Sequence, residues 1–341
     1  MLKISMKPTG WFHIAWSDEI ANGTSKPLKY FGQELVAFRA QPEGDGETGE
    51  LHVLDAHCRH LGAHLGYDSK VIGNCVACPY HGWQWNGDGE NTLVPYQDQP
   101  TKATMRKWHV AERDGLVWMW HDPAGGEPRA EFEYPDIFND FEELPANKPD
   151  FFPCYPQAVV NKPNEAIHPQ LILENSADCT HFKFTHDAAE FPRQEWVRVD
   201  GTVWKGKMGF ISPKTKQATL FLYNTCKTIG VTCAAFNSDK VSYRLILTAT
   251  PIDEFRSDLR VSYFFPRNGV VGDALPPDLV AFAKHTEVLF EEDARIWRHQ
   301  AFVQKPIYAL DDRAGYASLR SWCEQFYEAP EGQQVVRVVE E

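Results

Sequence analysis

Short apolar runs alternate with turn-forming residues along the first third of the chain, a pattern typical of antiparallel β-structure. Residues 11–16, 35–39 and 51–54 are mainly apolar, and residues 42–49 between them are rich in glycine and acidic residues. We therefore predict a strand over each apolar run and a hairpin loop over residues 42–49. Residues 116–120 are predicted to form the last strand of this half.

Between residues 203 and 265, apolar side chains recur at every second position. Examples are Leu220 with Leu222, and Tyr243 with Leu245 and Leu247. Such alternation predicts strands with one buried face, so we expect a second antiparallel sheet here. Cys226 and Cys233 lie within it and are expected to be small buried hydrophobic residues.

A long helix is predicted over residues 278–302, directly after two consecutive prolines that favour the first turn of a helix. Residues 122–126 contain proline and two glycines and mark a turn-rich exit from the first β-rich half. We expect two domains, residues 1–125 and residues 126–341, since 341 residues suffice for two hydrophobic cores.

Composition narrows the range of partners. The formal net charge is −13, which disfavours nucleic acid or an anionic membrane surface as a partner. The first seven residues lack the apolar run of a signal peptide, and no apolar stretch is long enough to span a bilayer. The eight cysteines do not follow the spacing of a disulfide framework, so we expect a cytoplasmic protein.

Two cysteines and two histidines form the most informative motif. Cys58 and His60 make a Cys-x-His pair, and after 17 intervening residues Cys78 and His81 make a Cys-x-x-His pair. Such a mixed set suits either a tetrahedral zinc ion or a Rieske-type 2Fe–2S cluster. Zinc fingers usually pair like ligands at each end, whereas here each loop brings one thiol and one imidazole, which favours the cluster. Cys75 is expected to be a core residue.

A second group of polar residues lies in the other half. Glu174, Asp178 and His181 are spaced to share one helical face, but His186 lies five residues after His181, about 140° round a helix. The two imidazoles can bind one metal ion only if the helix ends, bends or bulges between them. Two histidines with one carboxylate form the open-sided site of non-haem Fe(II) oxygenases. The alternative is an ordinary helix with incidental histidines.

The long predicted helix offers the carboxylate. A line of positions along one side of it is expected to face inward: Phe282, Thr286, Leu289, Asp293, Ile296 and Gln300. A carboxylate on an inward face is costly unless it is paired or binds metal, so Asp293 is the candidate ligand. Glu291 points away from this line and Glu292 lies to its side. The alternative for Asp293 is a buried ion pair with Arg295 or Arg298.

Together, the two cluster loops, the motif Asn175-x-x-Asp178-x-x-His181-x4-His186 and Asp293 resemble the oxygenase (α) components of Rieske non-haem iron oxygenases. The resemblance implies an α+β chain: an N-terminal all-β Rieske 2Fe–2S domain, and a C-terminal catalytic domain with an antiparallel sheet flanked by helices, of helix-grip type.

The resemblance also implies the cofactors and the role of each residue. Cys58 and Cys78 would hold one iron of the cluster and His60 and His81 the other, while His181, His186 and Asp293 would hold a mononuclear Fe(II). Asp178 would link His181 to His81 of a neighbouring subunit, which implies a homotrimer. Asn175 would lie beside the mononuclear iron without binding it.

Within that family, the chain resembles the oxygenase component of bacterial 3-ketosteroid 9α-hydroxylases, with the animal cholesterol 7-desaturases as relatives. The residues that carry this closer likeness are Gly87-Asp88-Gly89, Leu93-Val94-Pro95-Tyr96, Ile296-Trp297-Arg298-His299-Gln300 and Trp322-Cys323-Glu324-Gln325-Phe326-Tyr327. It implies a monooxygenase that hydroxylates a steroid-like apolar molecule with O₂. The electrons would come from NADH through a separate reductase that carries flavin and a 2Fe–2S cluster.

Other functions remain open at this point. The same metals could serve an aromatic-ring dioxygenase, an O-demethylase or a sterol desaturase. A different class would be a non-catalytic electron carrier or a zinc-stabilised binding protein, which would have no mononuclear iron. The sequence gives no residue-level match over residues 187–240, which would shape the substrate pocket.

Overall fold

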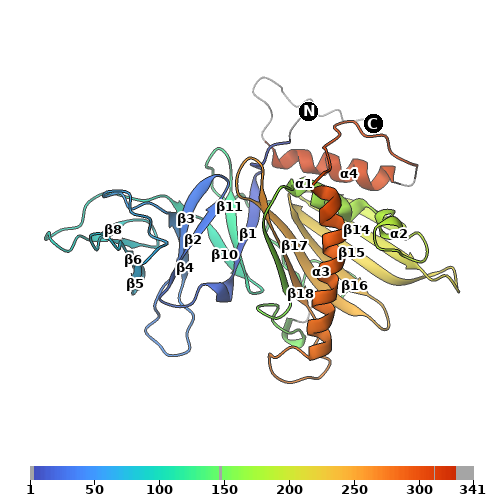
Figure 1. Cartoon of the computed structure of the whole chain (residues 1–341), viewed down its shortest axis with the longest axis horizontal. Helices are drawn as coiled ribbons and strands as arrows, with labels where there is room; N and C mark the ends of the chain where they lie inside the picture. The colour runs from blue at the N-terminus through green and yellow to red at the C-terminus, as the bar shows by residue number, and fades with distance from the viewer. Residues whose placement is uncertain (1–3, 146–147, 311, 328–341) are drawn as a thin grey trace.

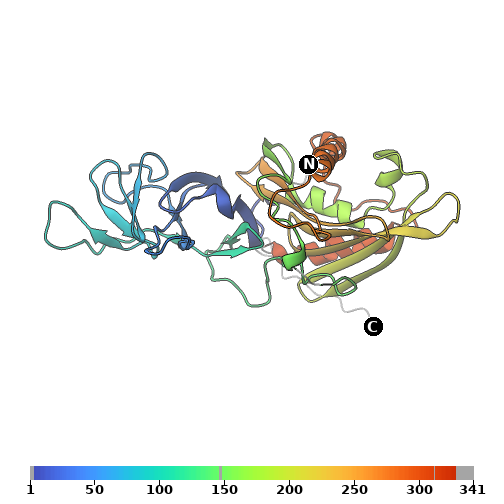
Figure 2. The same cartoon turned by 90° about the horizontal axis from the view of Figure 1, so that it is seen from below.

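The computed structural model describes residues 4–145, 148–310 and 312–327. The described chain forms two lobes side by side, an N-terminal lobe of small sheets and a C-terminal lobe built on one large sheet (Figures 1 and 2). This arrangement confirms the predicted α+β class, with an all-β first part and a helix-flanked antiparallel sheet in the second.

Three sheets make up the N-terminal lobe. They are a three-stranded sheet of β1 (Gly10–Trp16), β11 (Leu116–His121) and β10 (Val110–Arg113); a four-stranded sheet of β2 (Ser25–Tyr30), β3 (Gln33–Arg39), β4 (Leu51–Asp55) and β9 (Lys107–Trp108); and a four-stranded sheet of β5 (Lys70–Ile72), β6 (Cys75–Ala77), β7 (Gln84–Asn86) and β8 (Asn91–Leu93). The four strands predicted in this half coincide with β1, β3, β4 and β11. The sheet of β5 to β8 lies at the end of the molecule farthest from the C-terminal lobe (Figure 1).

The C-terminal lobe is organised around a seven-stranded sheet in which every neighbouring pair is antiparallel. Its strands, in spatial order, are β12 (Val159–Glu165), β18 (Ser257–Phe264), β17 (Ser242–Pro251), β16 (Val231–Asn237), β15 (Ala218–Thr228), β14 (Val203–Ile211) and β13 (Arg193–Asp200). The sheet was predicted, but its two edge strands were not. β12 contains Pro163, which an edge strand tolerates but which weakens a sequence-based strand prediction.

The four α-helices of the described residues lie in the second half of the chain, in two pairs. α1 (Pro169–Glu174) and α2 (His181–Phe184) precede β13, whereas α3 (Pro277–Trp297) and α4 (Arg313–Cys323) follow β18. α3 crosses one face of the large sheet (Figure 1). It ends at Trp297, five residues before the predicted end at residue 302. Within the described residues, no helix is both long and apolar enough to cross a membrane.

The buried side of α3 differs from the predicted inward line. The buried positions are Ala283, Thr286, Phe290, Ala294 and Trp297, whereas Leu289 and Ile296 of the predicted line are exposed. Relative to the predicted inward line, the helix is therefore rotated by about one position. The reason is that its small and aromatic side chains contact the sheet, whereas some of the apolar side chains of the predicted line do not. Asp293 lies at the edge of the buried stripe and not in its middle.

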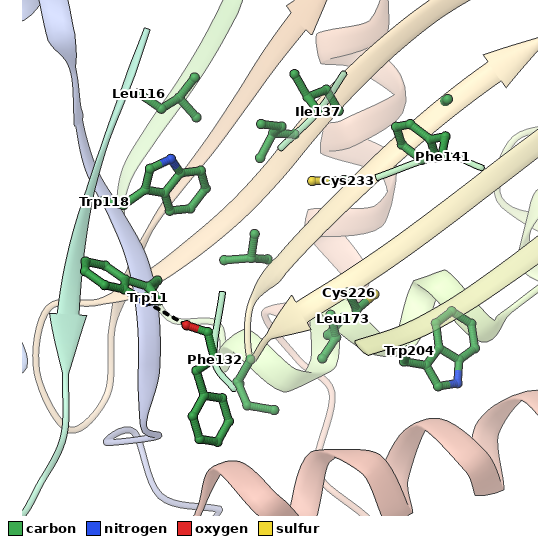
Figure 3. Packing of buried hydrophobic residues seen from close by; sticks show 14 of the residues in the cluster. Trp11, Leu116, Trp118, Phe132, Ile137, Phe141, Leu173, Trp204, Cys226 and Cys233 are labelled. Atoms are coloured by element: carbon green, nitrogen blue, oxygen red, sulfur yellow. Dashed lines mark hydrogen bonds between the residues drawn. The ribbon is translucent and has the colours of Figure 1, made fainter. Parts of the chain in front are cut away.

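The opposite face of the large sheet packs against β1, β11 and residues 132–141 (Figure 3). Trp120 contacts both Trp11 and Phe132 there, and the indole of Trp11 donates a hydrogen bond of 2.9 Å to the carbonyl of Phe132. Cys226 and Cys233 are buried in the same cluster, as predicted. Burial of these aromatic side chains is the main term that stabilises this part of the fold.

Polar contacts also join the two lobes. Arg260 of β18 is buried and donates hydrogen bonds to the hydroxyl of Tyr30 (2.8 Å) and to Asp258 (3.2 Å). Trp16 of β1 donates to the hydroxyl of Ser262 at 2.8 Å. The hydrogen bonds of Arg260 offset part of the cost of burying its charge, and together with the Trp16–Ser262 contact they help to define how the N-terminal lobe sits on the large sheet.

Candidate functional site

The four candidate cluster ligands lie on two loops of nearly identical geometry. In the first loop the amide of Gly62 donates to the carbonyl of Cys58 at 2.9 Å, and in the second Gly82 donates to Cys78 at 2.9 Å. Gly62 has φ +77° and Gly82 has φ +72°, values that favour glycine because it has no Cβ. The repeated turn holds Cys58 and Cys78 in the same backbone setting, with a histidine following inside each turn.

The side chains of these loops meet. The rings of His60 and His81 have centroids 4.7 Å apart, and Cys58 and Cys78 are buried free thiols. Burial raises the pKa of the Cys58 thiol. The Nδ1 atoms of both histidines are buried and have no hydrogen-bond partner in the described residues. Two orphaned imidazole nitrogens and two buried thiols on these two loops are a donor set that fits a Cys₂His₂ metal cluster.

Aromatic side chains cover these histidines. Trp83 lies parallel to the ring of His60, and Tyr80 lies over His81 with ring centroids 3.8 Å apart. Tyr80 is itself 65% exposed, so it covers the histidine from the solvent side. Cys75 is only partly buried and contacts the hydroxyl of Thr92 at 3.4 Å, so the expectation of a core position was wrong.

The second candidate site lies on a broken helical segment. α1 ends at Glu174, a 3-10 turn covers Asn175–Ala177, and Asp178 is extended before α2 begins at His181. The expectation that Glu174, Asp178 and His181 share one helical face was therefore wrong. The break arises because the carboxylate of Asp178 accepts the backbone amides of Thr180 (2.9 Å) and His181 (3.0 Å), which competes with helical hydrogen bonding.

The predicted interruption between the two histidines is present. α2 ends at Phe184, and Asp187 adopts a left-handed conformation with φ +52°, so the chain turns directly after His186. The two imidazoles consequently face each other, with ring centroids 5.4 Å apart.

Asp293 of α3 completes this group. One ligand atom from each of His181, His186 and Asp293 lies within 4.8 Å of the others. The Nε2 atom of His186 is 3.2 Å from the Asp293 carboxylate, and the amide of Asn175 lies 3.4 Å from both His181 Nε2 and Asp293. Two imidazoles and a carboxylate converging in this way fit a 2-His-1-carboxylate metal site. The alternative partner Arg298 instead binds Glu165 and Glu291.

A second carboxylate, which the sequence analysis set aside, also contacts this group. Glu292 lies 2.9 Å from Nδ1 of His186, on the opposite side of the ring from Asp293. Burial alone would lower the pKa of His186, but the carboxylates of Asp293 and Glu292 outweigh it and raise that pKa above its usual value. Only the adjacency of Glu292 to Asp293 in sequence hinted at this contact.

Asp178 lies on the other side of the group. Its carboxylate is 3.7 Å from Nδ1 of His181, and its side chain is 20% exposed. Burial would raise the pKa of Asp178, but the nearby imidazole of His181, the hydroxyl of Tyr316 and the backbone amide of His181 hold it below its usual value. The carboxylate is therefore charged at neutral pH and can still be reached from solvent.

A cavity of about 400 Å³ opens from the two histidines and Asp293 and runs between α3 and the large sheet. Its walls carry mainly aromatic and aliphatic side chains, among them Phe182, Phe210, Phe236, Leu245 and Phe290. No lysine or arginine is among its described lining residues. Such a volume is in the usual range for small-molecule sites.

Three of the polar residues in the cavity wall are hydrogen-bonded to one another. The hydroxyl of Ser176 lies 3.0 Å from that of Thr232, and the amide of Asn224 donates to the carbonyl of Ser176 at 3.2 Å. Because these groups have partners within the wall, the cavity offers few free hydrogen-bonding groups to a ligand.

Two family models match this chain. Residues 10–111 match the Rieske [2Fe-2S] domain, and residues 119–327 match the 3-ketosteroid 9alpha-hydroxylase C-terminal domain. The second match covers more than half of the chain.

The chain is similar to whole proteins of two named kinds. It is 28% identical to a probable 3-ketosteroid-9-alpha-monooxygenase oxygenase component of Rhodococcus rhodochrous, over 93% of this chain and 79% of that protein. It is 26% identical to the cholesterol 7-desaturase of Hemicentrotus pulcherrimus, over 94% of this chain and 70% of that protein. The two relatives carry out different named reactions.

Among solved structures, dicamba monooxygenase bound to dicamba has a TM-score of 0.68 at 20% identity, covering 95% of this chain and 98% of that one. A mutant of NdmA from Pseudomonas putida CBB5 with caffeine also has a TM-score of 0.68, at 19% identity, covering 93% of this chain and 89% of that one. At these identities the likeness shows a shared fold only.

Proposed function

Because this chain belongs to the Rieske oxygenase family that has the 3-ketosteroid 9α-hydroxylase C-terminal domain, we propose that it hydroxylates a steroid-like apolar substrate. The family carries a Rieske 2Fe–2S cluster and a mononuclear iron, and its oxygenase components work with a separate reductase. Within this proposal the substrate is a 3-ketosteroid or a close analogue, and one oxygen atom from O₂ enters the product.

The observation that carries the proposal is the absence of a cation from the described wall of the cavity. An aromatic acid brings a carboxylate, which would be buried there without an ion-pair partner at a cost of several kcal/mol or more. A steroid is almost wholly apolar, and burying its surface contributes about 25 cal/mol per Å². The cavity wall therefore favours the steroid.

We propose that Cys58, His60, Cys78 and His81 hold the cluster. We propose that His181, His186 and Asp293 hold the mononuclear iron, which supplies the O₂ chemistry when bound. Three protein ligands leave one side of the centre open toward the cavity. Asn175 lies beside these ligands without being one of them.

The protein's own contribution is to position the substrate and to exclude water. Phe182, which contacts both His186 and Phe210, forms an apolar wall beside the three ligands. This apolar wall contacts the substrate ring system and offers few hydrogen-bond partners to ordered water.

We propose that electrons arrive from a neighbouring copy of this chain. The loops of Cys58 and Cys78 lie in the N-terminal lobe, whereas α2 and α3 lie in the C-terminal lobe (Figure 1). A head-to-tail homotrimer would place His81 of one copy beside the partly exposed, charged Asp178 of the next. The proposed electron source is an NADH-dependent reductase with flavin and a 2Fe–2S cluster.

We also propose that the chain divides near residue 125, into residues 1–125 and 126–341. In support, β11 ends at His121, and no later strand joins the sheets of the N-terminal lobe within the described residues. A cytoplasmic location is proposed because all eight cysteines are free thiols, which a reducing compartment preserves.

The test is product mass spectrometry. The protein would be incubated with a surrogate reductase, NADH, isotopically labelled O₂, and a panel of 3-ketosteroids, sterols and aromatic acids. We expect a 3-ketosteroid to gain one labelled oxygen atom. The variant His181→Ala serves as the control, because it should lose turnover and keep the visible absorbance of the cluster.

Other products would contradict parts of the proposal. An aromatic product with two labelled oxygens would overturn the steroid assignment. Loss of two hydrogens from a sterol would replace hydroxylation by desaturation. Iron analysis that finds no iron beyond the two of the cluster would favour an electron carrier instead.

A further inference from the structure

Two consecutive residues of α3 place carboxylates on opposite sides of one imidazole. Asp293 lies 3.2 Å from Nε2 of His186, and Glu292 lies 2.9 Å from Nδ1 of the same ring. Consecutive positions on a helix are about 100° apart, so a single helix can contact both nitrogens of a ring that lies alongside it. α3 thus reaches His186 from both sides.

The contact with Glu292 determines which ring nitrogen carries the proton. A carboxylate only accepts hydrogen bonds, so Nδ1 of a neutral His186 must be the donor. Nε2 then presents its lone pair toward Asp293 and His181, as a metal ligand requires. The same hydrogen bond, from Nδ1 of His186 to Glu292, also fixes the orientation of the imidazole ring.

Glu292 is available for this role because no other described residue forms a hydrogen bond or ion pair with its carboxylate. In the part of the chain that the structure describes, no lysine or arginine lies within ion-pair distance of Glu292. By contrast, the preceding Glu291 is paired with both Arg298 and Lys162. The single described polar contact of the Glu292 carboxylate is therefore with His186.

The other histidine lacks such a contact. Nδ1 of His181 is buried without a hydrogen-bond partner in the described residues, and the nearest carboxylate, Asp178, is 3.7 Å away. That Asp178 oxygen already accepts two backbone amides. Within one chain, only one of the two imidazoles is thus held from behind by a carboxylate.

We propose that Glu292 is a positioning residue that fixes His186 for iron binding. This inference rests on the proposed function, because it requires that His186 and Asp293 bind iron. Carboxylates behind metal-binding histidines orient the ring and increase its basicity, and their loss typically costs 10- to 100-fold in metal affinity. Glu292 would act through His186 and would touch neither substrate nor metal.

The test measures Fe(II) affinity and needs no turnover. A mild chelator would remove the mononuclear iron while the visible absorbance of the cluster is monitored, and Fe(II) would then be titrated by equilibrium dialysis without O₂. For Glu292→Gln we expect a Kd about 10- to 100-fold higher than for the unaltered protein. Glu292→Asp keeps the charge but withdraws it by one methylene, and should give a smaller increase.

The matched control is Glu287→Gln. Glu287 lies on the same helix and, among the described residues, its ion-pair partner is Lys162, at 3.4 Å, so this variant removes the same charge away from His186. We expect its Fe(II) affinity to be unchanged. Both Gln variants should keep the absorbance of the cluster. Both should also keep the Tm that the protein has without mononuclear iron. If Glu292 had a merely structural role, Glu292→Gln would lower that Tm.

Three outcomes would overturn the inference. One is equal Fe(II) affinity in Glu292→Gln and the unaltered protein. Another is an equal loss in Glu287→Gln, which would show a general charge effect. The third is an unaltered protein that binds no Fe(II) beyond the cluster, which would refute the proposed iron site itself and this inference with it.

Discussion

The imidazole of His60 lies parallel to the indole of Trp83, with 4.6 Å between ring centroids and 3° between ring planes. The indole is held in this orientation because its N–H donates to the hydroxyl of Tyr96 at 2.7 Å. Tyr96 belongs to the Leu93–Tyr96 stretch that contributed to the family resemblance. The stretch therefore has a physical role, because Tyr96 holds the indole of Trp83 in place over His60, a candidate cluster ligand.

We expect Trp83→Ala to shorten the lifetime of the cluster. Without the indole, water and chelators reach the His60 side of the cluster, and burial is one of the factors that protect and tune such centres. The measurement is the decay of the visible absorbance in dilute chelator. Tyr96→Phe keeps both rings and removes one hydrogen bond, so its decay should be only slightly faster; equal decay in Trp83→Ala and the unaltered protein would refute the shielding role.

We expect Asp178→Asn to keep both metal centres and to lower turnover by about 10- to 100-fold. The charged carboxylate lies 3.7 Å from Nδ1 of His181 and is exposed to an approaching subunit, whereas an amide carries no charge to link two imidazoles. Turnover and iron content would be measured together. Asp187→Asn is the control, because Asp187 is exposed and asparagine tolerates its left-handed backbone. Normal turnover in Asp178→Asn would refute the linking role.

We expect Ala234→Leu to reduce steroid turnover by narrowing the cavity. Ala234 lines the cavity, and added methylene groups there should lower kcat/KM for a steroid by about 10- to 200-fold. Iron content and Tm should stay close to those of the unaltered protein. Ala235→Leu is the matched contrast, because Ala235 faces the packed core on the other side of the sheet. A leucine there should destabilise the fold by about 1–3 kcal/mol. Unchanged kcat/KM in Ala234→Leu would place the substrate elsewhere.

We expect the contribution of Glu291 to stability to disappear in acid. The side chain of Arg298 holds the pKa of Glu291 at about 2, below its usual 4.5. A carboxyl whose pKa is lowered by folding stabilises the protein above its unfolded pKa, and this contribution is lost as pH falls from about 4.5 to about 2. Because Glu291 is 44% exposed, solvent screens the pair.

Urea denaturation of Glu291→Gln and the unaltered protein would check this. At neutral pH the variant should be less stable by about 0.5–1 kcal/mol. At about pH 3 the difference in stability should be smaller, because Glu291 is then mostly protonated in the unfolded protein and begins to be protonated in the folded protein. A difference that grows toward low pH would contradict the ion pair with Arg298.

The first candidate site is one that a sequence can suggest, because the geometry of its two loops is local. Each loop needs only a cysteine, a nearby histidine and a glycine that can adopt positive φ, as at Gly62 and Gly82. The sequence also predicted that the chain must break between His181 and His186, since a regular helix separates them. It was wrong about Cys75, because the depth of a residue in a small sheet depends on what covers it.

Some residues that suggested the steroid-hydroxylating family have a packing role. Trp322 and Phe326 are buried, with ring centroids 4.6 Å apart, and Trp297 is buried under α3. None of these three side chains lines the cavity of about 400 Å³. They therefore identify the fold of the C-terminal lobe and carry little information on the substrate.

By itself, the sequence determined which residue types can bind metal, that the chain has two candidate sites, and that a sheet and a long helix follow the second histidine motif. Only the tertiary structure decided that Asp293 meets His186 across 107 residues and that Glu292 contacts the same ring. The reason is physical. An amphipathic pattern gives the rotation of a helix to within about one residue, and one residue, about 100°, decides which carboxylate faces a site. That rotation was decided by the packing of Ala283, Phe290 and Ala294 against the large sheet.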